Sequence, residues 1–430
     1  CQPGASPLSV LGRLCPRTSG ARHGGRAGMM VVFSGGGTAG HFHPARNIAE
    51  ALTGEVPGVQ PYFVGARGRI EEAELPGLGY PYRLLRVAGL RSPLGAMRGE
   101  GRGVRGVAAL VSAAAANVRA LWLLAWAVCR LLPDLRKRAA AAVVVTGGYV
   151  SAPAGIVGRL LGVPVVVQEQ NRHAGRTTRL LARWARQIHV AYPEATAGLP
   201  GPARGRVVHS GNPIRPLPPP EKRDRKASRR ALGAPAGGSV ILVVGGSQGA
   251  RKMNRAMIEI LQDGMPNERE FVLWLTGRAH FAAAGAALAG VPRDRFAIVP
   301  YLEPERMYLA LAAADLAVSR AGAMATSEFL AWGLPAILVP LPAAASGHQT
   351  ANARALEEAG AAVHLPELDG SGARLRGGRL WSEVRRLLDA PGLLAAMSAA
   401  ARERARPDAA RDVAAAIAGL LRPRPTDAAS

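Results

Sequence analysis

Two glycine-rich loops, each between an apolar strand and a helix, constrain the fold of this 430-residue chain more than any other feature. The first loop spans residues 35–41 and the second 245–250, and a run of apolar residues precedes each. Backbone N–H groups at a helix start carry partial positive charge and bind phosphates or other anions. The two loops therefore predict twin domains that face each other across a cleft, each with its own phosphate-bearing ligand.

Unbroken runs of Val, Ile and Leu recur along both halves of the chain and alternate with helical segments. We expect strands at 61–65, 142–146 and 163–167 in the first half, and at 241–244, 271–275, 296–299, 315–318 and 335–339 in the second. Such runs are typical of strands buried on both faces, in parallel sheets covered by helices. The predicted fold class is therefore α/β, with two Rossmann-like domains.

The composition places boundaries between these domains. Residues 29–215 are expected to form the N-terminal domain and 239–397 the C-terminal domain, joined by a linker at 216–238 that is rich in proline and charge. Residues 1–28 lack acids, resemble a transit peptide in composition, and are interpreted as an extraneous leader before a start at Met29 or Met30. Residues 422–430 are expected to form a disordered tail.

Arginine supplies nearly all the positive charge behind the net charge of +24. The chain is also rich in Ala, Gly and Pro, which indicates a GC-rich genome, so codon bias accounts for part of the arginine content. Such a chain attracts nucleotides, pyrophosphates or an acidic membrane surface. Nucleic acid is not an expected partner, because aromatic residues make up 5% of the chain and no groove-reading motif occurs. The three cysteines are too scattered for a disulfide framework or a metal site, which indicates a reducing compartment.

The segment 106–129 is the most apolar of the chain. Arg119 divides it into two uncharged runs, each shorter than the roughly 20 residues that cross a bilayer. On a helix, Arg119, Trp122, Trp126 and Arg130 share one stripe, and tryptophan beside arginine suits a lipid interface. The alternative is a helix that covers the sheet.

The first loop matches the dinucleotide fingerprint Gly-x-Gly-x-x-Gly at 35–40, but 65–67 read Gly-Ala-Arg where NAD binding needs an acid. NAD is therefore disfavoured. His41 directly follows the loop and could accept a proton from a hydroxyl, or could merely bond to the loop or a phosphate. The loops at 147–151 and 168–171 leave strands of the same sheet, so they should approach His41 or form ordinary turns.

The second half offers polar side chains at corresponding places. Glu328 stands in the first turns of a helix, where a carboxylate can accept both hydroxyls of a ribose or only offset the helix dipole. Gln349 and Asn352 share one helix face and could hold sugar hydroxyls, or form a solvated surface. No Asp-x-Asp pair occurs, so a metal-bridged diphosphate is disfavoured. We expect neither a metal nor a cofactor.

In this order the motifs resemble those of the glycosyltransferase family 28 enzymes that add N-acetylglucosamine to undecaprenyl-pyrophosphoryl-MurNAc-pentapeptide, turning lipid I into lipid II. The likeness runs from about Met29 to Leu421. It rests on Gly-Gly-Gly-Thr-Ala-Gly-His-Phe-His-Pro (35–44), Gly-Gly-Tyr-Val-Ser (147–151), Glu-Gln-Asn (169–171), Gly-Asn-Pro-Ile-Arg (211–215), Gly-Gly-Ser-Gln-Gly-Ala-Arg (245–251), Ser-Arg-Ala-Gly-Ala with Glu328, and His-Gln-x-x-Asn-Ala (348–353). The resemblance implies a GT-B fold whose C-terminal helix, about 398–421, returns to the first domain.

The resemblance also implies UDP-N-acetylglucosamine as the donor, bound mainly by the second domain. Its contacts would be Thr38, Gly40, Asn171, Arg215, Ser247, Gln248, Tyr301, Leu302, Gly322, Ala323, Glu328, Gln349 and Asn352. Among these, Arg215 and Ser247 would meet the diphosphate, Glu328 the ribose, Gln349 and Asn352 the sugar, and Tyr301 the uracil. The pyrophosphate and sugar of the lipid-linked acceptor would contact Gly36, Gly37, Tyr149 and Asn171, and Ser151 would be a further acceptor contact.

The implied reaction is a single inverting displacement that forms a β-linkage and releases UDP. Arg215 and backbone N–H groups, rather than a metal, would stabilise the leaving group. His41 would be the base or its positioning partner, and Glu169 is the rival. Two departures concern the donor: Ala325 replaces a common hydroxyl residue, and 343–347 lack a charge often found there.

The implied location is the cytoplasmic face of the cell membrane, where the protein would be peripheral. The segment 106–129 would contact an anionic membrane surface there, with cell-wall synthesis or division proteins as further partners. Three alternatives stay open: a UDP-N-acetylglucosamine 2-epimerase of the same architecture, another UDP-sugar-dependent lipid glycosyltransferase, and a non-catalytic UDP-sugar-binding scaffold.

Overall fold

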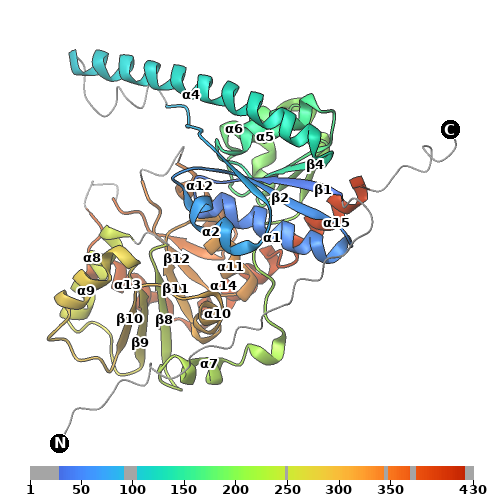
Figure 1. Cartoon of the computed structure of the whole chain (residues 1–430). Helices are drawn as coiled ribbons and strands as arrows, with labels where there is room; N and C mark the ends of the chain where they lie inside the picture. The colour runs from blue at the N-terminus through green and yellow to red at the C-terminus, as the bar shows by residue number, and fades with distance from the viewer. Residues whose placement is uncertain (1–28, 92–103, 247–249, 343–346, 369–373, 422–430) are drawn as a thin grey trace, which may run out of the picture.

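Two α/β domains stacked on one another make up the structure, a computed structural model that describes residues 29–91, 104–246, 250–342, 347–368 and 374–421 (Figure 1). The predicted pair of Rossmann-like domains is confirmed. The leader 1–28, the tail 422–430 and the donor candidates Ser247 and Gln248 lie outside the described residues.

The N-terminal sheet has seven strands, and every pairing in it is parallel. In spatial order they are β3 (Tyr82–Leu85), β2 (Gln60–Ala66), β1 (Met30–Ser34), β4 (Ala140–Val145), β5 (Val165–Glu169), β6 (Gln187–Val190) and β7 (Val207–His209). Helices cover both faces, so alternate residues of one strand enter different cores: Val32 packs into one apolar cluster, and Val31 and Phe33 into another. This explains the unbroken apolar runs.

The C-terminal sheet repeats this design with six parallel strands. Their order is β10 (Phe296–Val299), β9 (Glu270–Leu275), β8 (Ser239–Val244), β11 (Leu316–Ser319), β12 (Ala336–Leu338) and β13 (Ala362–His364). In each sheet the strand order reverses between the first and fourth strands, which in open α/β sheets marks the ligand crevice. The first glycine loop lies at such a point, and so does the end of β8 that precedes the second.

The helices follow the strands in alternation. In the first domain they are α1 (Ala39–Glu55), α2 (Ile70–Leu78), α4 (Val104–Lys137), α5 (Ser151–Leu160) and α6 (Arg176–Leu181), with 3-10 turns η1 (Pro193–Gly198) and η2 (Gly201–Arg206). The second domain has η4 (Arg278–His280), α8 (Arg251–Gln262), α9 (Phe281–Ala287), α10 (Pro304–Ala313), α11 (Ala323–Trp332), α12 (His348–Glu358), α13 (Gly377–Leu388) and α14 (Pro391–Arg404).

Residues 216–238, expected to be a linker, include η3 (Pro220–Lys222) and α7 (Arg225–Ala231). The α7 helix packs on the second domain through Arg229, whose side chain is 4% exposed. Its guanidinium donates to the carbonyl of Ala313 at 3.1 Å and pairs with Asp315 at 2.5 Å. Because a buried guanidinium needs such partners, this segment is anchored on the C-terminal domain.

The chain returns to the first domain through a separate helix, α15 (Ala409–Leu421), which lies beside α1 in Figure 1. Val413 and Ile417 of α15 are buried in the same apolar cluster as Phe42 of α1. The preceding α14 packs instead on α11 of the second domain, where Ser398 Oγ donates to the carbonyl of Gly333 at 2.6 Å. The chain therefore returns to the first domain after α14.

The apolar segment forms part of α4, which extends well beyond the body of the molecule (Figure 1). Near its C-terminal end, Leu131 and Leu135 are buried in the core of the first sheet. On its outer face, Val111, Val118 and Trp122 are 64–69% exposed. Its stretch Ala108–Lys137 has a window of mean hydropathy 1.6 that is 11% buried, so length and composition alone would let it cross a membrane.

Candidate active site

His41, in the first turn of α1, is oriented by two oxygen acceptors. Its Nδ1 lies 2.7 Å from Oε1 of Gln170 and 3.0 Å from the carbonyl of Thr146. Gln170 Nε2 donates to that same carbonyl at 2.7 Å, which fixes the orientation of the amide. The hydrogen-bond network thus assigns the proton to Nδ1 and leaves Nε2 with a lone pair. A histidine in this tautomer can accept a proton at Nε2.

Two glycines let the imidazole approach the strand ends. Gly147 and Gly148 have φ of +89° and +74°, a region that favours glycine. A Cβ on Gly147 would lie 3.1 Å from Nδ1 of His41, and one on Gly148 would lie 2.5 Å from the carbonyl oxygen of Gly36. The loop after β4 and the loop after β1 therefore meet at His41.

Glu169, the rival base, organises the neighbouring loop. Its side chain is 3% exposed, and Oε1 accepts the backbone N–H of Asn171 at 3.1 Å and its Nδ2 at 3.2 Å. Oε2 accepts the N–H of Gly175 at 2.9 Å. Three N–H donors therefore occupy this carboxylate.

Asn171 and Asn352 join the two domains. Nδ2 of Asn352 donates to Oδ1 of Asn171 at 3.2 Å, and Oδ1 of Asn352 accepts the N–H of Arg172 at 3.0 Å. Gln349, one turn earlier on α12, accepts the N–H of Leu341 at 2.8 Å. These amides, expected to contact sugars, bond to protein groups in this structure.

A cavity of about 500 Å³ connects His41 to the long helix α4. Gly36, Gly37, Thr38, Tyr149, Glu169 and Asn171 line it, together with His348 of the second domain. Apolar walls come from the segment 87–90 and from Ala120, Leu121 and Leu124 of α4, and Arg69, Arg176 and Thr177 add polar lining. Ser151 takes no part in this lining, since it is fully buried and donates to the carbonyl of Gly148 at 3.0 Å. The cavity suits a ligand with a polar head and an apolar tail.

On the second domain, Glu328 of α11 faces the first domain. Burial raises the pKa of Glu328 to about 7, while the positive charges of Arg215 and His43 act against this rise. Among the described residues, neither Glu328 nor Arg215 has a side-chain hydrogen bond or ion pair. A free carboxylate and a free guanidinium at one interface can receive hydroxyls and an anion, respectively.

The remaining donor candidates surround α11 and the end of β10. Gly322 is the N-cap of α11, so the N–H groups that follow, from Ala323 on, form an anion-binding helix start. Tyr301 is 39% exposed, with the guanidinium of Arg278 5.0 Å from its ring centroid, while Leu302 is buried beside it. Thr38 and Gly40 lie across the interface at the start of α1.

The sequence reasoning assigned no role to Gln170 and Asn212. Gln170 orients His41, and Asn212 Nδ2 donates to the carbonyl of Gln170 at 3.1 Å and to Oγ of Ser327 at 2.9 Å. Both residues stand inside motifs that carried the resemblance. Their contacts, however, depend on how the domains meet, which the sequence pattern does not show.

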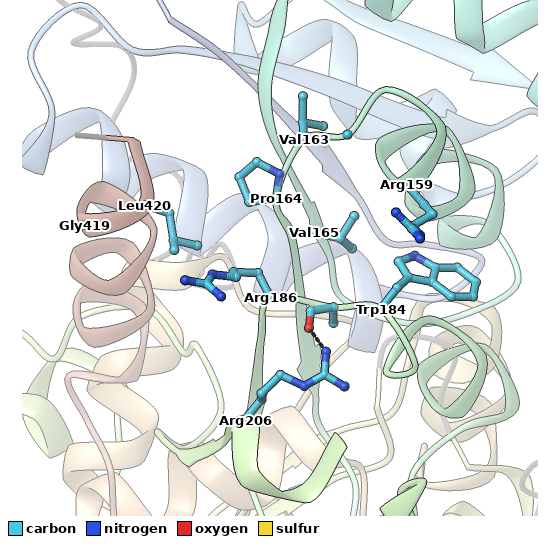
Figure 2. A pocket seen from close by; sticks show the side chains of 11 residues that line it. Arg159, Val163, Pro164, Val165, Trp184, Arg186, Arg206, Gly419 and Leu420 are labelled. Carbon is cyan, nitrogen blue, oxygen red and sulfur yellow. Dashed lines mark hydrogen bonds between the residues drawn. The ribbon is translucent and has the colours of Figure 1, made fainter. Parts of the chain in front are cut away.

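A larger cavity, about 610 Å³, lies at the other edge of the first sheet (Figure 2). Val163 and Pro164 precede β5 there, and Gly419 and Leu420 of α15 close one side. Arg206 donates to the carbonyl of Ala182 at 3.0 Å, so it is engaged with the backbone. Ligands of such sheets bind at the carboxyl ends of the strands, and this cavity is at the amino ends. The cavity at His41 is therefore the candidate active site.

Two doubly wound domains with parallel sheets, whose loops meet at a candidate site, have the GT-B architecture of sugar transferases. Two family models match the chain: "Glycosyltransferase family 28 N-terminal domain" over residues 31–190 and "Glycosyltransferase family 28 C-terminal domain" over residues 240–413. The chain belongs to glycosyltransferase family 28.

Individual relatives agree with this assignment. The UDP-N-acetylglucosamine–N-acetylmuramyl-(pentapeptide) pyrophosphoryl-undecaprenol N-acetylglucosamine transferase of Salinibacter ruber is 38% identical over 390 residues, covering 91% of this chain and 96% of that one. The crystal structure of Acinetobacter baumannii MurG matches with a TM-score of 0.65 at 26% identity, covering 91% of this chain and 99% of that chain. A UDP-GlcNAc 2-epimerase from Neisseria meningitidis shares the fold alone, at 11% identity and a TM-score of 0.57 over 91% of this chain and 99% of that one.

Proposed function

We propose that this enzyme transfers N-acetylglucosamine from UDP-N-acetylglucosamine to the 4-hydroxyl of MurNAc in undecaprenyl-pyrophosphoryl-MurNAc-pentapeptide. One observation carries the proposal: His41, whose Nε2 has no protein partner among the described residues, lines a cavity that joins a glycine loop to an apolar helix. That cavity accommodates a pyrophosphate and the start of a lipid chain. The name of the similar transferase of Salinibacter ruber gives the same donor and acceptor.

In the proposed reaction, the 4-hydroxyl oxygen attacks the anomeric carbon while the bond from that carbon to the diphosphate oxygen breaks. Nε2 of His41 takes the hydroxyl proton, and UDP leaves with the bonding electrons. Arg215 and the N–H groups at the start of α11 stabilise the negative charge that develops on UDP. Glu328 accepts the ribose hydroxyls, Tyr301 covers the uracil, and Gln349 and Asn352 hold the sugar after exchanging their present partners.

A coupled assay of UDP release tests the proposal. With UDP-N-acetylglucosamine alone the protein should release no UDP above background, and adding a short-chain lipid I analogue should start turnover. EDTA should leave the rate unchanged, because fixed cations and N–H groups replace a metal. Formation of UDP-N-acetylmannosamine without an acceptor would show an epimerase instead, and binding without turnover would show a scaffold.

We further propose that the outer face of α4 lies on the anionic cytoplasmic surface of the membrane. Val118 and Trp122 are 69% and 64% exposed there, and Arg119 lies between them. Apolar side chains beside a cation suit the interface between lipid headgroups and acyl chains. Cell-wall synthesis or division proteins as partners stay a prediction from the family resemblance.

The double variant Val118→Glu with Trp122→Glu should bind phosphatidylglycerol vesicles at least about tenfold more weakly, because each side chain loses apolar burial and gains repulsion. Vesicle co-sedimentation measures this, while turnover of a water-soluble acceptor should be unchanged. Leu393→Glu, at an exposed leucine of α14, is the matched control. Equal binding by the double variant and the parent would place the membrane contact elsewhere.

A further inference from the structure

A carboxyl group lies buried directly beneath the first glycine loop. Glu71, in the first turn of α2, is 0% exposed. Its Oε1 accepts the N–H of Gly37 at 2.7 Å, and its Oε2 is buried without a partner among the described residues. Burial raises the pKa of Glu71, and the backbone N–H groups of Glu71, Gly37 and Ala66, together with the charge of Arg69, only partly oppose this. Glu71 has no role in the proposed transfer reaction.

The loop backbone is shaped around this carboxyl group. A Cβ on Gly36 would lie 1.4 Å from Oε1 of Glu71, and one on Gly65 of β2 would lie 2.8 Å from its Cβ. Only glycine therefore fits at either place without a shift of Glu71 or of the loop. No ion pair neutralises Glu71 within the part of the chain that the structure describes.

The other surface of the same loop is open to a ligand. Gly36, Gly37 and Thr38 line the cavity at His41. In the described residues, no protein acceptor receives the N–H groups of Thr38, Ala39 or Gly40, which begin α1. A pyrophosphate bound there would place its negative charge close to an unpaired buried carboxylate, and like charges in a low-dielectric site favour protonation of one of them.

We propose that Glu71 positions the glycine loop through Gly37 and takes up one proton from solvent when the acceptor pyrophosphate binds. The inference rests on the proposed function, because it needs a pyrophosphate at this loop. The proton joins the unpartnered Oε2, while Oε1 continues to accept the N–H of Gly37. Glu71 is thus a positioning residue that makes acceptor binding depend on pH.

The neighbouring groups fix the sign of this dependence. Arg69, just before α2, favours the charged form of Glu71, whereas the bound anion disfavours it. The pair of His43 on α1 and Glu74 on α2, 3.3 Å apart, and the phenol of Tyr149 beside Gly37 lie nearby. The other ionisable groups that line the cavity are His41, Glu169, Arg176 and His348. The bound anion raises the pKa of Glu71. Acceptor affinity therefore falls as the pH increases from the pKa of Glu71 in the free enzyme to the pKa of Glu71 in the complex.

Calorimetry with a short-chain polyprenyl-pyrophosphoryl-MurNAc-pentapeptide, in buffers of different protonation enthalpy, measures the proton taken up. Within that pH window, the parent should take up about one proton per acceptor bound, and its acceptor dissociation constant should rise up to about tenfold per pH unit. Glu71→Gln keeps an oxygen for the N–H of Gly37 and replaces the protonated oxygen with an amide. It should bind the acceptor without proton uptake and with a flat pH profile, while its dissociation constant for UDP stays unchanged.

Glu72→Gln is the matched control, since exposed Glu72 accepts only the N–H of Gly68 at 2.6 Å and should keep the uptake. His41→Asn should also keep it. Three results would each overturn the inference: no proton uptake by the parent, equal uptake by Glu71→Gln, or loss of uptake in His41→Asn. The first and third results can be obtained even if Glu71→Gln does not fold. Failure of the proposed function is distinct: the parent would then release no UDP with any acceptor.

Discussion

Replacing His41 with alanine should lower kcat about 10²–10⁴-fold and leave the KM for the donor within about twofold. The variant loses the Nε2 that accepts the hydroxyl proton, while Arg215, Glu328 and the start of α11 stay in place to bind UDP. UDP release at saturating acceptor, with the donor varied, separates the two constants. A drop confined to kcat identifies a group that acts in the transition state.

His280→Ala is a control for this experiment, because His280 belongs to η4 and does not line the cavity. Gln170→Ala should give a smaller loss of kcat, since it frees the ring of His41 to turn without removing it. If His41→Ala keeps most of its kcat and Glu169→Gln does not, the base is Glu169. That result would also mean that the three N–H donors to Glu169 are exchanged when substrates bind.

Glu328→Gln should weaken UDP binding about 10–100-fold above neutral pH, because a carboxylate accepts ribose hydroxyls more strongly than a neutral amide. The pKa of Glu328 is raised from 4.5 to about 7. The carboxylate is the binding form, so UDP affinity of the parent should increase with pH and level off above about 7. The variant should show a flat profile, and isothermal calorimetry with UDP measures both.

A double-mutant cycle with UDP and its 2′-deoxy analogue assigns the contact. If Glu328 binds the ribose, removing the hydroxyl should cost much less affinity in Glu328→Gln than in the parent. Glu305→Gln, at an exposed acid in the first turn of α10, should behave like the parent. Additive losses from the variant and the analogue would place the ribose away from Glu328.

Most strands could be predicted from the sequence, but β3, β6, β7 and β13 could not. Runs such as 142–146 and 271–275 lie inside a sheet, where burial on both faces leaves an unbroken apolar pattern. The strands β3, β6, β7 and β13 have three or four residues, and Tyr82 of β3 is 40% exposed. β10, β11 and β12 are as short but almost wholly apolar, whereas each missed strand contains an Arg, Gln or His that interrupts the apolar run.

For the site, the sequence indicates which loops converge but not how their side chains bond. The sheet rule brings the loops after β1, β4 and β5 to one edge, and the structure has them together around His41. The orientation of His41 by Gln170, the buried Glu71 and the pairing of Asn171 with Asn352 each depend on a tertiary contact. A periodic pattern in the sequence reflects burial along one helix or strand and carries no information about contacts between elements that are distant in the sequence.

The return of α15 to the first domain has a consequence for the order in which the protein assembles during synthesis. Phe42 and Ile48 of α1 are covered by Val413 and Ile417, which the ribosome adds more than half a chain later. While the second domain emerges and folds, this face of α1 has no partner, and exposed apolar surface of this kind invites aggregation or chaperone binding. The half of the enzyme that is translated first is therefore the half that completes its core last.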